Sequence, residues 1–182
     1  DHILSHASSH LGNVPVTDTS SIVNDTKKDW ESNSKLKILL LLPPSWGIIF
    51  PPYNLAKLSA VLRQQGHTVK VVDLNIESYY YLKNLDGKDY WKSQLYFLWS
   101  IKENFYSQLL PQLKPFFKKI IDSIVEDQPD VIGMSLYGTN IHAAEYILYE
   151  LQKKLPDACY LAGGPEIASS GGEKTWIRFM PF

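Results

Sequence analysis

The residues best suited to ligand chemistry lie in three turns, each after an apolar run. Ser135 and Thr139 follow the run that starts at Val131, and their hydroxyl groups can donate hydrogen bonds. Gly163 and Gly164 follow the last run, and because they lack a Cβ atom a ligand can approach their backbone closely. A glycine pair also commonly does no more than shape a turn. The residue types leave both interpretations of the glycines open.

The third turn, residues 43 to 53, is mostly apolar. Its side chains include Trp46, Ile48 and Ile49, which offer contact surface to a large flat ligand. The residues Pro43-Pro44-Ser45-Trp46-Gly47 match neither the GxGxxG fingerprint nor the P-loop pattern. The turn therefore disfavours the binding of dinucleotides and nucleoside triphosphates.

Residues suited to acid, base or metal chemistry form no recognisable constellation. Asp73 ends an apolar run, where it would bind a ligand hydroxyl or cap the next segment. His67 follows a predicted helix end and His142 lies in the first turn of another predicted helix, near the three turns. His2, His6 and His10 recur every fourth residue, but the surrounding serines disfavour the helix that would group them. We predict no catalytic residue and no metal ligand.

Composition excludes several classes of partner. The sequence has 18 basic and 19 acidic residues and a formal net charge of -1, so it lacks the basic footprint of a nucleic-acid-binding protein. No apolar run approaches the about 20 residues that a membrane helix needs. The sequence has one cysteine, Cys159, and no signal-peptide pattern at its start. These features predict a cytoplasmic protein without membrane or nucleic-acid partners.

Parallel strands must position the three turns. Short apolar runs at 36–42, 68–74, 131–135 and 159–162 predict buried strands. Helical spacing predicts helices at 53–65 and 140–155, the first with Asn54 as its N-cap and Gly66 at its C-terminal end. Strands that alternate with helices indicate an α/β fold with a doubly wound, flavodoxin-like (Rossmann-type) parallel sheet. Because such a sheet ordinarily has at least one more strand, we expect the sequence to be truncated.

A long segment, residues 75–128, separates the second and third predicted strands. It is rich in aromatic residues, and an apolar stripe from Leu113 to Val125 predicts a helix that covers the sheet. We therefore predict a helical, aromatic-rich insertion. Packing of the aromatic side chains in the core is favoured over a ligand-binding or partner-binding surface.

The predicted strand order brings the three turns together. In an open α/β sheet, ligands bind at the carboxyl ends of strands where the crossovers leave to opposite faces. In the flavodoxin-like order the first and third strands flank that point. The turns at 43–53 and 136–140 should therefore lie side by side, with Gly163-Gly164 next to them.

Composition along the chain predicts three regions. Residues 1–34 are rich in Ser, Asn, Asp and Thr, which predicts a flexible extension because few apolar groups are available for burial. Residues 35–167 form the predicted α/β domain. Residues 168–182 are predicted to be a tail that begins a missing region.

Six short motifs follow one another along the predicted domain. They are Lys-Ile-Leu-Leu-Leu-Leu-Pro-Pro (37–44), Pro-Pro-Tyr-Asn-Leu-Ala (51–56), Leu-Arg-Gln-Gln-Gly-His (62–67), Val-Lys-Val-Val-Asp (69–73), Pro-Asp-Val-Ile-Gly-Met-Ser (129–135) and Ala-Gly-Gly-Pro-Glu (162–166). In this order and spacing they resemble the N-terminal cobalamin-binding domain of cobalamin-dependent radical S-adenosylmethionine enzymes. The resemblance covers roughly residues 36–167 and is fairly specific only as a whole.

The resemblance implies a cobalamin site at the three turns, with the nucleotide tail in a slot beside the sheet. The motif Asp-x-His-x-x-Gly that supplies histidine to cobalt in related proteins is absent, so the resemblance implies that Trp46, Ile48 or Ile49 faces the cobalt. The cofactor-binding residues that it implies are Pro44, Trp46, Ile48, Ile49, Ser135, Tyr137, Thr139, Gly163, Gly164 and Pro165.

One motif of these enzymes is missing from this sequence. The motif Cys-x-x-x-Cys-x-x-Cys, which holds the iron-sulfur cluster in these enzymes, is missing. The cluster and S-adenosylmethionine would therefore be bound by a downstream barrel domain, and this chain would be the non-catalytic cofactor module of a larger enzyme, a methyltransferase among the candidates.

Two other functions stay open. The pattern Leu-Arg-x-x-Gly-His-x-Val at 62–69 is similar to the N-terminal half of two-domain glycosyltransferases, which would imply a second α/β half and no cobalt. Alternatively, the chain is a non-enzymatic module whose aromatic segment at 79–117 binds a protein partner.

Overall fold

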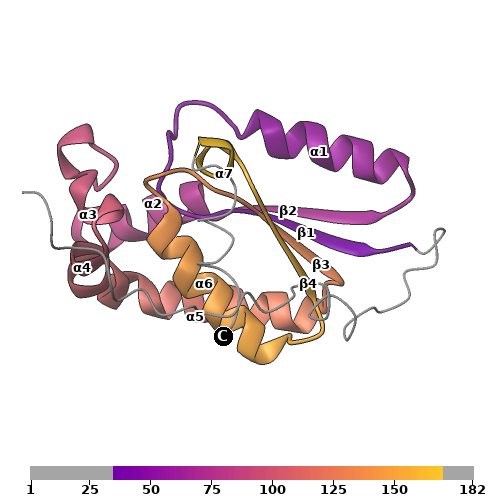
Figure 1. Cartoon of the computed structure of the whole chain (residues 1–182). Coiled ribbons are helices and arrows are strands. Elements are labelled where there is room, and N and C mark those ends of the chain that lie inside the picture. Colours follow the sequence, from indigo (N-terminus) through magenta and orange to yellow (C-terminus); the bar gives the residue numbers. More distant parts are fainter. Residues whose placement is uncertain (1–34, 170–182) are drawn as a thin grey trace, which may run out of the picture. The chain divides into compact units, whose positions relative to one another are not determined.

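The computed structural model describes residues 35–169, which belong to the unit Lys35–Phe182. Four parallel strands form one sheet in the order β2-β1-β3-β4 (Figure 1). This order confirms the predicted flavodoxin-like α/β fold. The strands are β1 (Lys37–Leu42), β2 (Thr68–Asp73), β3 (Val131–Ser135) and β4 (Cys159–Gly163).

The apolar run of β1 is continuous because both faces of the strand are buried. Ile38, Leu40 and Leu42 belong to a small cluster on one face of the sheet. Leu39 and Leu41 point to the opposite face and belong to the larger core cluster. Alternation of side chains along a strand requires this division.

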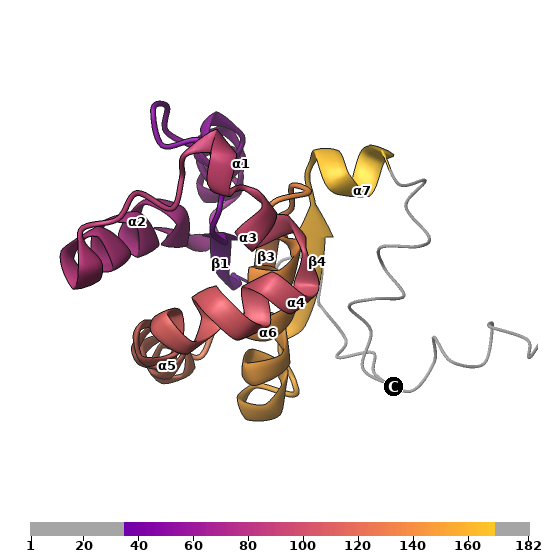
Figure 2. The same cartoon turned by 90° about the vertical axis from the view of Figure 1, so that its left-hand side faces the viewer.

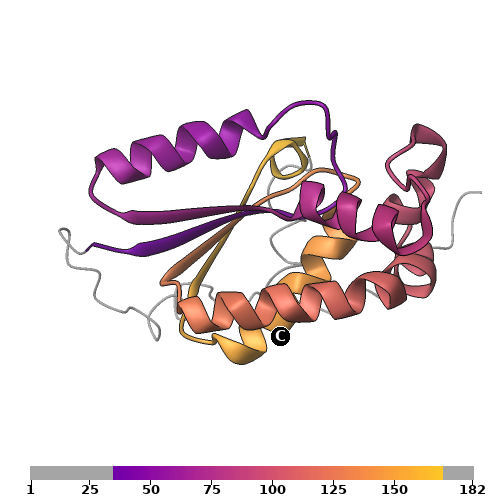
Figure 3. The same ribbon diagram turned by 180° about the vertical axis from the view of Figure 1, so that it is seen from behind.

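One long helix covers the first face of the sheet and two cover the other. Helix α1 (Tyr53–Gln64) lies on the first face, and α5 (Leu110–Asp127) and α6 (Ile141–Lys154) lie on the second (Figures 1 and 3). Gly66 follows α1 with a φ of 91°, as predicted. The prediction of Asn54 as the N-cap is wrong. Pro52 is the N-cap residue, and the Asn54 side chain bonds to β3 instead.

The predicted aromatic insertion consists of one helix of 13 residues, α2, and several short helical segments before α5. They are α2 (Leu74–Asp86), η1 (Ser93–Leu95), α3 (Phe97–Ser100), α4 (Lys102–Asn104) and η2 (Phe105–Leu109), a π-helical turn. Trp91, Trp99, Phe105 and Phe117 are buried in the larger core, which confirms the predicted core role for these rings. Figure 2 shows α3 and α4 in front of the carboxyl ends of the strands.

The second strand and the C-terminal turn depart slightly from prediction. Strand β2 ends at Asp73 rather than residue 74, because the Asp73 carboxylate accepts a hydrogen bond from the Ile76 backbone N–H and begins α2 there. A short helix, α7 (Pro165–Ser169), follows β4, where no helix was predicted. The predictions for residues 1–34 and 170–182, including those for His2, His6 and His10, lie outside the described residues.

Candidate ligand site at the carboxyl ends of the strands

Two of the three turns are joined by side-chain hydrogen bonds. The Thr139 hydroxyl donates to the backbone carbonyl oxygen of Ser45 over 2.6 Å. The buried Asn140 amide donates to the carbonyl oxygens of Pro43 at 3.2 Å and Ser135 at 3.0 Å. The predicted convergence of the 43–53 and 136–140 turns is therefore confirmed.

The Gly163-Gly164 turn is joined to the 136–140 turn by backbone hydrogen bonds. The Leu136 N–H donates to the Gly163 carbonyl oxygen at 2.7 Å, and the Glu166 N–H donates to the Leu136 carbonyl oxygen at 3.3 Å. Gly164 has a φ of 113°, and a Cβ atom there would lie 2.5 Å from the Leu136 oxygen. Gly164 is thus required by the turn itself. A Cβ atom on Gly163 would meet nothing within 4 Å.

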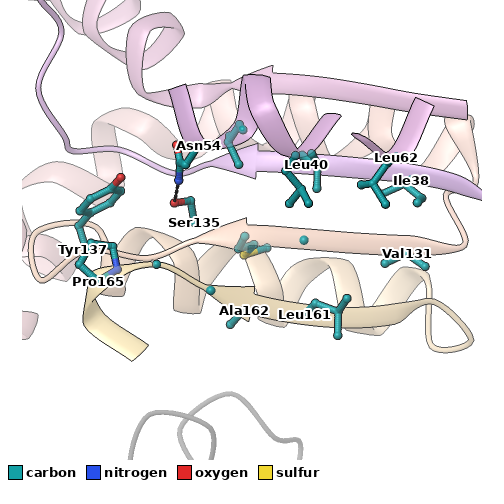
Figure 4. Close-up of a pocket in the computed structure, with 16 residues that line it drawn as sticks. Ile38, Leu40, Asn54, Leu62, Val131, Ser135, Tyr137, Leu161, Ala162 and Pro165 are labelled. Carbon is teal, nitrogen blue, oxygen red and sulfur yellow. Dashed lines mark hydrogen bonds between the residues drawn. The ribbon is translucent and has the colours of Figure 1, made fainter. Parts of the chain in front are cut away.

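A slot of about 630 Å³ opens below these turns, between α1 and the first face of the sheet (Figure 4). It crosses β1, β3 and β4. The slot is lined by Ile38, Leu40, Asn54, Leu55, Leu58, Leu62, Val131, Gly133, Met134, Ser135, Tyr137, Leu161, Ala162, Gly163, Gly164 and Pro165.

The slot exists because α1 covers this face of the sheet incompletely. Leu55 of α1 is buried with Ile38 and Leu40 of β1. On β4, by contrast, the Leu161 side chain remains 51% exposed. The neighbouring position on β3 is Gly133, whose missing side chain deepens the floor between β1 and β4. An apolar hollow of this kind is the usual form of a small-molecule site.

The polar side chains of the slot lie at one end. The Asn54 amide donates to the buried Ser135 hydroxyl oxygen at 2.8 Å, next to Tyr137 and Pro165 (Figure 4). We call this end the mouth, because it lies at the carboxyl ends of the strands, and the opposite end, at Ile38, Leu62 and Val131, the inner end.

The implied site residues divide into two groups. Five of them line the slot and five do not. The residues that line it are Ser135, Tyr137, Gly163, Gly164 and Pro165.

The other five lie in or against the joined turns. Pro44 is buried, and Ile48 packs against the larger core. The Trp46 ring lies 5.1 Å from the Tyr137 ring, centroid to centroid. The Thr139 hydroxyl is bonded to Ser45, and Ile49 is 83% exposed. Of the three residues implied to face cobalt, Ile49 is thus the most exposed.

A buried amide that sequence reasoning missed holds the 43–53 turn in place. The Asn75 side-chain oxygen accepts hydrogen bonds from the Trp46 backbone N–H at 2.8 Å and from the Trp91 indole N–H at 2.7 Å. Its amide nitrogen donates to the Gly47 carbonyl oxygen at 3.3 Å. Asn75 therefore links the 43–53 turn to the aromatic insertion.

The Asp73, His142 and His67 side chains, which could have bound a ligand, lie outside the slot. Burial raises the pKa of the Asp73 carboxyl, against the lowering effect of hydrogen bonds from the Ile76 and Asn75 backbone. Both His142 ring nitrogens have acceptors nearby, the Glu145 carboxylate at 3.1 Å and the Ser100 carbonyl oxygen at 3.3 Å. The His67 Nδ1 atom accepts a hydrogen bond from the Leu36 N–H. These side chains have structural partners.

Two absences hold for residues 35–169. No group of three or more His, Cys, Asp and Glu side chains in this range is arranged to hold a metal ion. No helix within the same range has the length and apolar character to cross a membrane.

Comparison with known proteins does not assign the chain to a family. No protein-family model matches the chain, and no curated protein or solved structure is significantly similar to it.

Proposed function

We propose that this chain binds cobalamin and serves as the cofactor module of a radical S-adenosylmethionine enzyme. The main support is the slot, which opens beneath the turns where the sequence resemblance implies a nucleotide tail. The resemblance implies that Ser135, Thr139, Gly163 and Gly164 lie at the tail. Ser135, Gly163 and Gly164 line the slot, whereas Thr139 does not.

The shape of the slot suits a flat ring on a polar linker. Gly133 provides a floor without a side chain, and a Cβ atom there would come within 3.0 Å of a Leu40 methyl carbon. Gly163 borders open space, so a ligand can pass close to its backbone. The Ser135 hydroxyl and the Asn54 amide supply hydrogen-bonding groups at the mouth.

The corrin ring of the proposed cofactor would lie over the joined turns. Ile49 and Phe50 are among the most exposed large apolar side chains of the described residues and would contact it. No histidine of residues 35–169 lines the slot. Bound cobalamin would supply the cobalt centre for methyl transfer or related chemistry.

Under this proposal the remaining cofactors belong to another domain. The single cysteine, Cys159, cannot provide the three thiolates of an iron-sulfur cluster. A single cysteine cannot form a disulfide within the chain, which suits a reducing, cytoplasmic setting. The downstream barrel domain would be the main partner of this chain.

Titration with aquacobalamin tests the proposal directly. The purified chain should perturb the visible spectrum of aquacobalamin, and calorimetry should give saturable binding. The variant Gly163→Phe should abolish binding, because its ring fills the mouth of the slot. Gly163→Ala is the matched control and should bind nearly as the wild type does, because a Cβ atom there meets nothing within 4 Å.

Two results would reject cobalamin binding at this place. One is a wild-type chain that gives neither heat nor spectral change. The other is a folded Gly163→Phe variant with unaltered affinity. Saturable binding of a nucleoside-diphosphate sugar instead would favour the glycosyltransferase interpretation.

A further inference from the structure

We infer that the slot selects a corrinoid whose lower base is dimethylbenzimidazole over one whose lower base is adenine. This inference rests on the proposed function and concerns only the part of the cofactor that enters the slot. It follows from the distribution of polar groups along the slot.

Strand register orders the slot lining into three levels. Ile38 and Val131 are paired at the inner end, Gly133 and Leu161 are paired at the middle, and Ser135 and Gly163 are paired at the mouth. The polarity of the lining side chains decreases from the mouth to the inner end. The hydroxyl and amide groups lie at the mouth, whereas the middle and inner levels present aliphatic groups and a glycine (Figure 4).

The inner end offers no polar side chain among its described lining residues. Ile38 and Val131 form the floor and Leu62 the wall, with Leu40 and Leu161 nearer the middle. The backbone groups of β1 and β3 at this level take part in the parallel ladder within the sheet. Ile38 and Val131 are only 6% and 9% exposed, so a polar group that reaches the floor between them would lose hydrogen bonds to water, although the slot is open to solvent beside Leu161.

The two lower bases differ in the polarity of the edge that would reach the inner end of the slot. Adenine carries an exocyclic amine and additional ring nitrogens, which need hydrogen-bond partners when buried. Dimethylbenzimidazole carries two methyl groups at the corresponding edge, which are stabilised by contact with aliphatic side chains.

The mouth fixes which end of the tail points inward. The ribose and phosphate that join the base to the corrin ring are polar and suit the Asn54–Ser135 pair. The Ser135 oxygen already accepts the Asn54 hydrogen bond, so its own hydroxyl hydrogen is directed elsewhere and can reach a ligand acceptor. This orientation places the base at the aliphatic inner end.

Three corrinoids separate the inference from the proposed function. The full chain is titrated with aquacobalamin, with its adenine-based analogue and with aquacobinamide, which has no nucleotide tail. We expect aquacobalamin to bind about tenfold or more tightly than the adenine analogue, in line with the cost of unpaired buried polar groups. Aquacobinamide should also bind more weakly than aquacobalamin.

Any other order of the three affinities contradicts the inference, and one outcome also contradicts the proposed function. Equal affinity for aquacobalamin and the adenine analogue overturns the selectivity and leaves the proposed function standing. Equal affinity for aquacobalamin and aquacobinamide shows that the tail lies outside the slot and overturns the inference as well. Absence of binding by all three removes the proposed function and the inference together.

A variant at the inner end tests the physical cause. Leu62 is only partly buried and packs against the small cluster from α1, so substitution there leaves the buried strands intact. Leu62→Gln adds a hydrogen-bonding group beside the base and should reduce the preference for aquacobalamin at least severalfold. Leu62→Met is the apolar control and should retain it. A folded Leu62→Gln variant with an unchanged preference would overturn the assignment of the base to the inner end.

Discussion

Thr139 and Ser45 are joined by a 2.6 Å hydrogen bond from the Thr139 hydroxyl to the Ser45 carbonyl oxygen, 94 positions apart in the chain. The bond joins two turns of the candidate site, although Thr139 itself does not line the slot. Thr139 therefore has a structural role in the site.

Thr139→Val should lower the free energy of unfolding by about 1 kcal/mol, the usual contribution of one hydrogen bond of this kind. Urea denaturation measures the change. Thr139→Ser keeps the hydroxyl and serves as the control, so an equal loss in both variants would show that the methyl group matters and the bond does not.

Asn75→Ala should destabilise the chain more strongly, by about 2 to 4 kcal/mol, because the Trp46 and Trp91 N–H groups lose their acceptor in a buried place. The Asn75 side chain is only 2% exposed, so water cannot easily replace it. The intrinsic fluorescence of Trp91 and Trp46 should change as well. Asn104→Ala, at an exposed hydrogen bond to Phe97, is the control and should have little effect.

Gly164→Ala should be costly, by about 2 to 4 kcal/mol, because it combines a left-handed backbone with steric overlap against Leu136. The adjacent Gly163→Ala has neither problem and should leave the unfolding midpoint nearly unchanged. Comparable losses from the two substitutions would mean that the turn adopts another conformation in solution.

Asp122 should make stability depend on pH in the acid range. Hydrogen bonds from Lys118 and then Lys154 lower the pKa of this exposed carboxyl from 3.8 to about 2. Because the pKa is lowered in the folded state, the stabilisation is present above the ordinary pKa and is lost as the pH falls toward about 2.

The Asp122→Asn variant measures this contribution. Its stability deficit relative to the wild type should be present at neutral pH and shrink between about pH 5 and about pH 2, and added salt should weaken it. Asp157→Asn, on the exposed turn after α6, provides the comparison. A deficit that stays constant with pH would contradict a charge effect of Asp122 on α5 and α6.

The strands were predictable because each one is a short apolar run with a clear end. β3 matches its predicted bounds. The alternation of strands and helices predicted parallel pairing, and the flavodoxin-like order was expected as one of the common orders of such sheets. The order in turn placed the turns at 43–53, 136–140 and 163–164 together. Local patterns, combined with the expected strand order, therefore sufficed to predict that these turns meet.

The side-chain partners within the site were not predictable in this way. Asn54 bonds to Ser135 across 81 positions, Asn75 to Trp46 across 29 and Asn140 to Pro43 across 97. Nothing in the local sequence distinguishes such a long-range partner from an ordinary helix cap. The different directions of Ile48 and Ile49, one toward the core and one toward solvent, likewise depend on loop geometry.

Helix α1 buries fewer of its side chains than α6 does. Only Leu55 and Ser59 are buried along it, whereas α6 buries most of its inward face. Its outer amide hydrogens should accordingly exchange with deuterated water sooner than those of α6. Any molecule that fills the gap beside Leu58 and Leu62 would become part of the packing under this helix, and slower exchange along α1 would report its arrival without any need for a coloured cofactor.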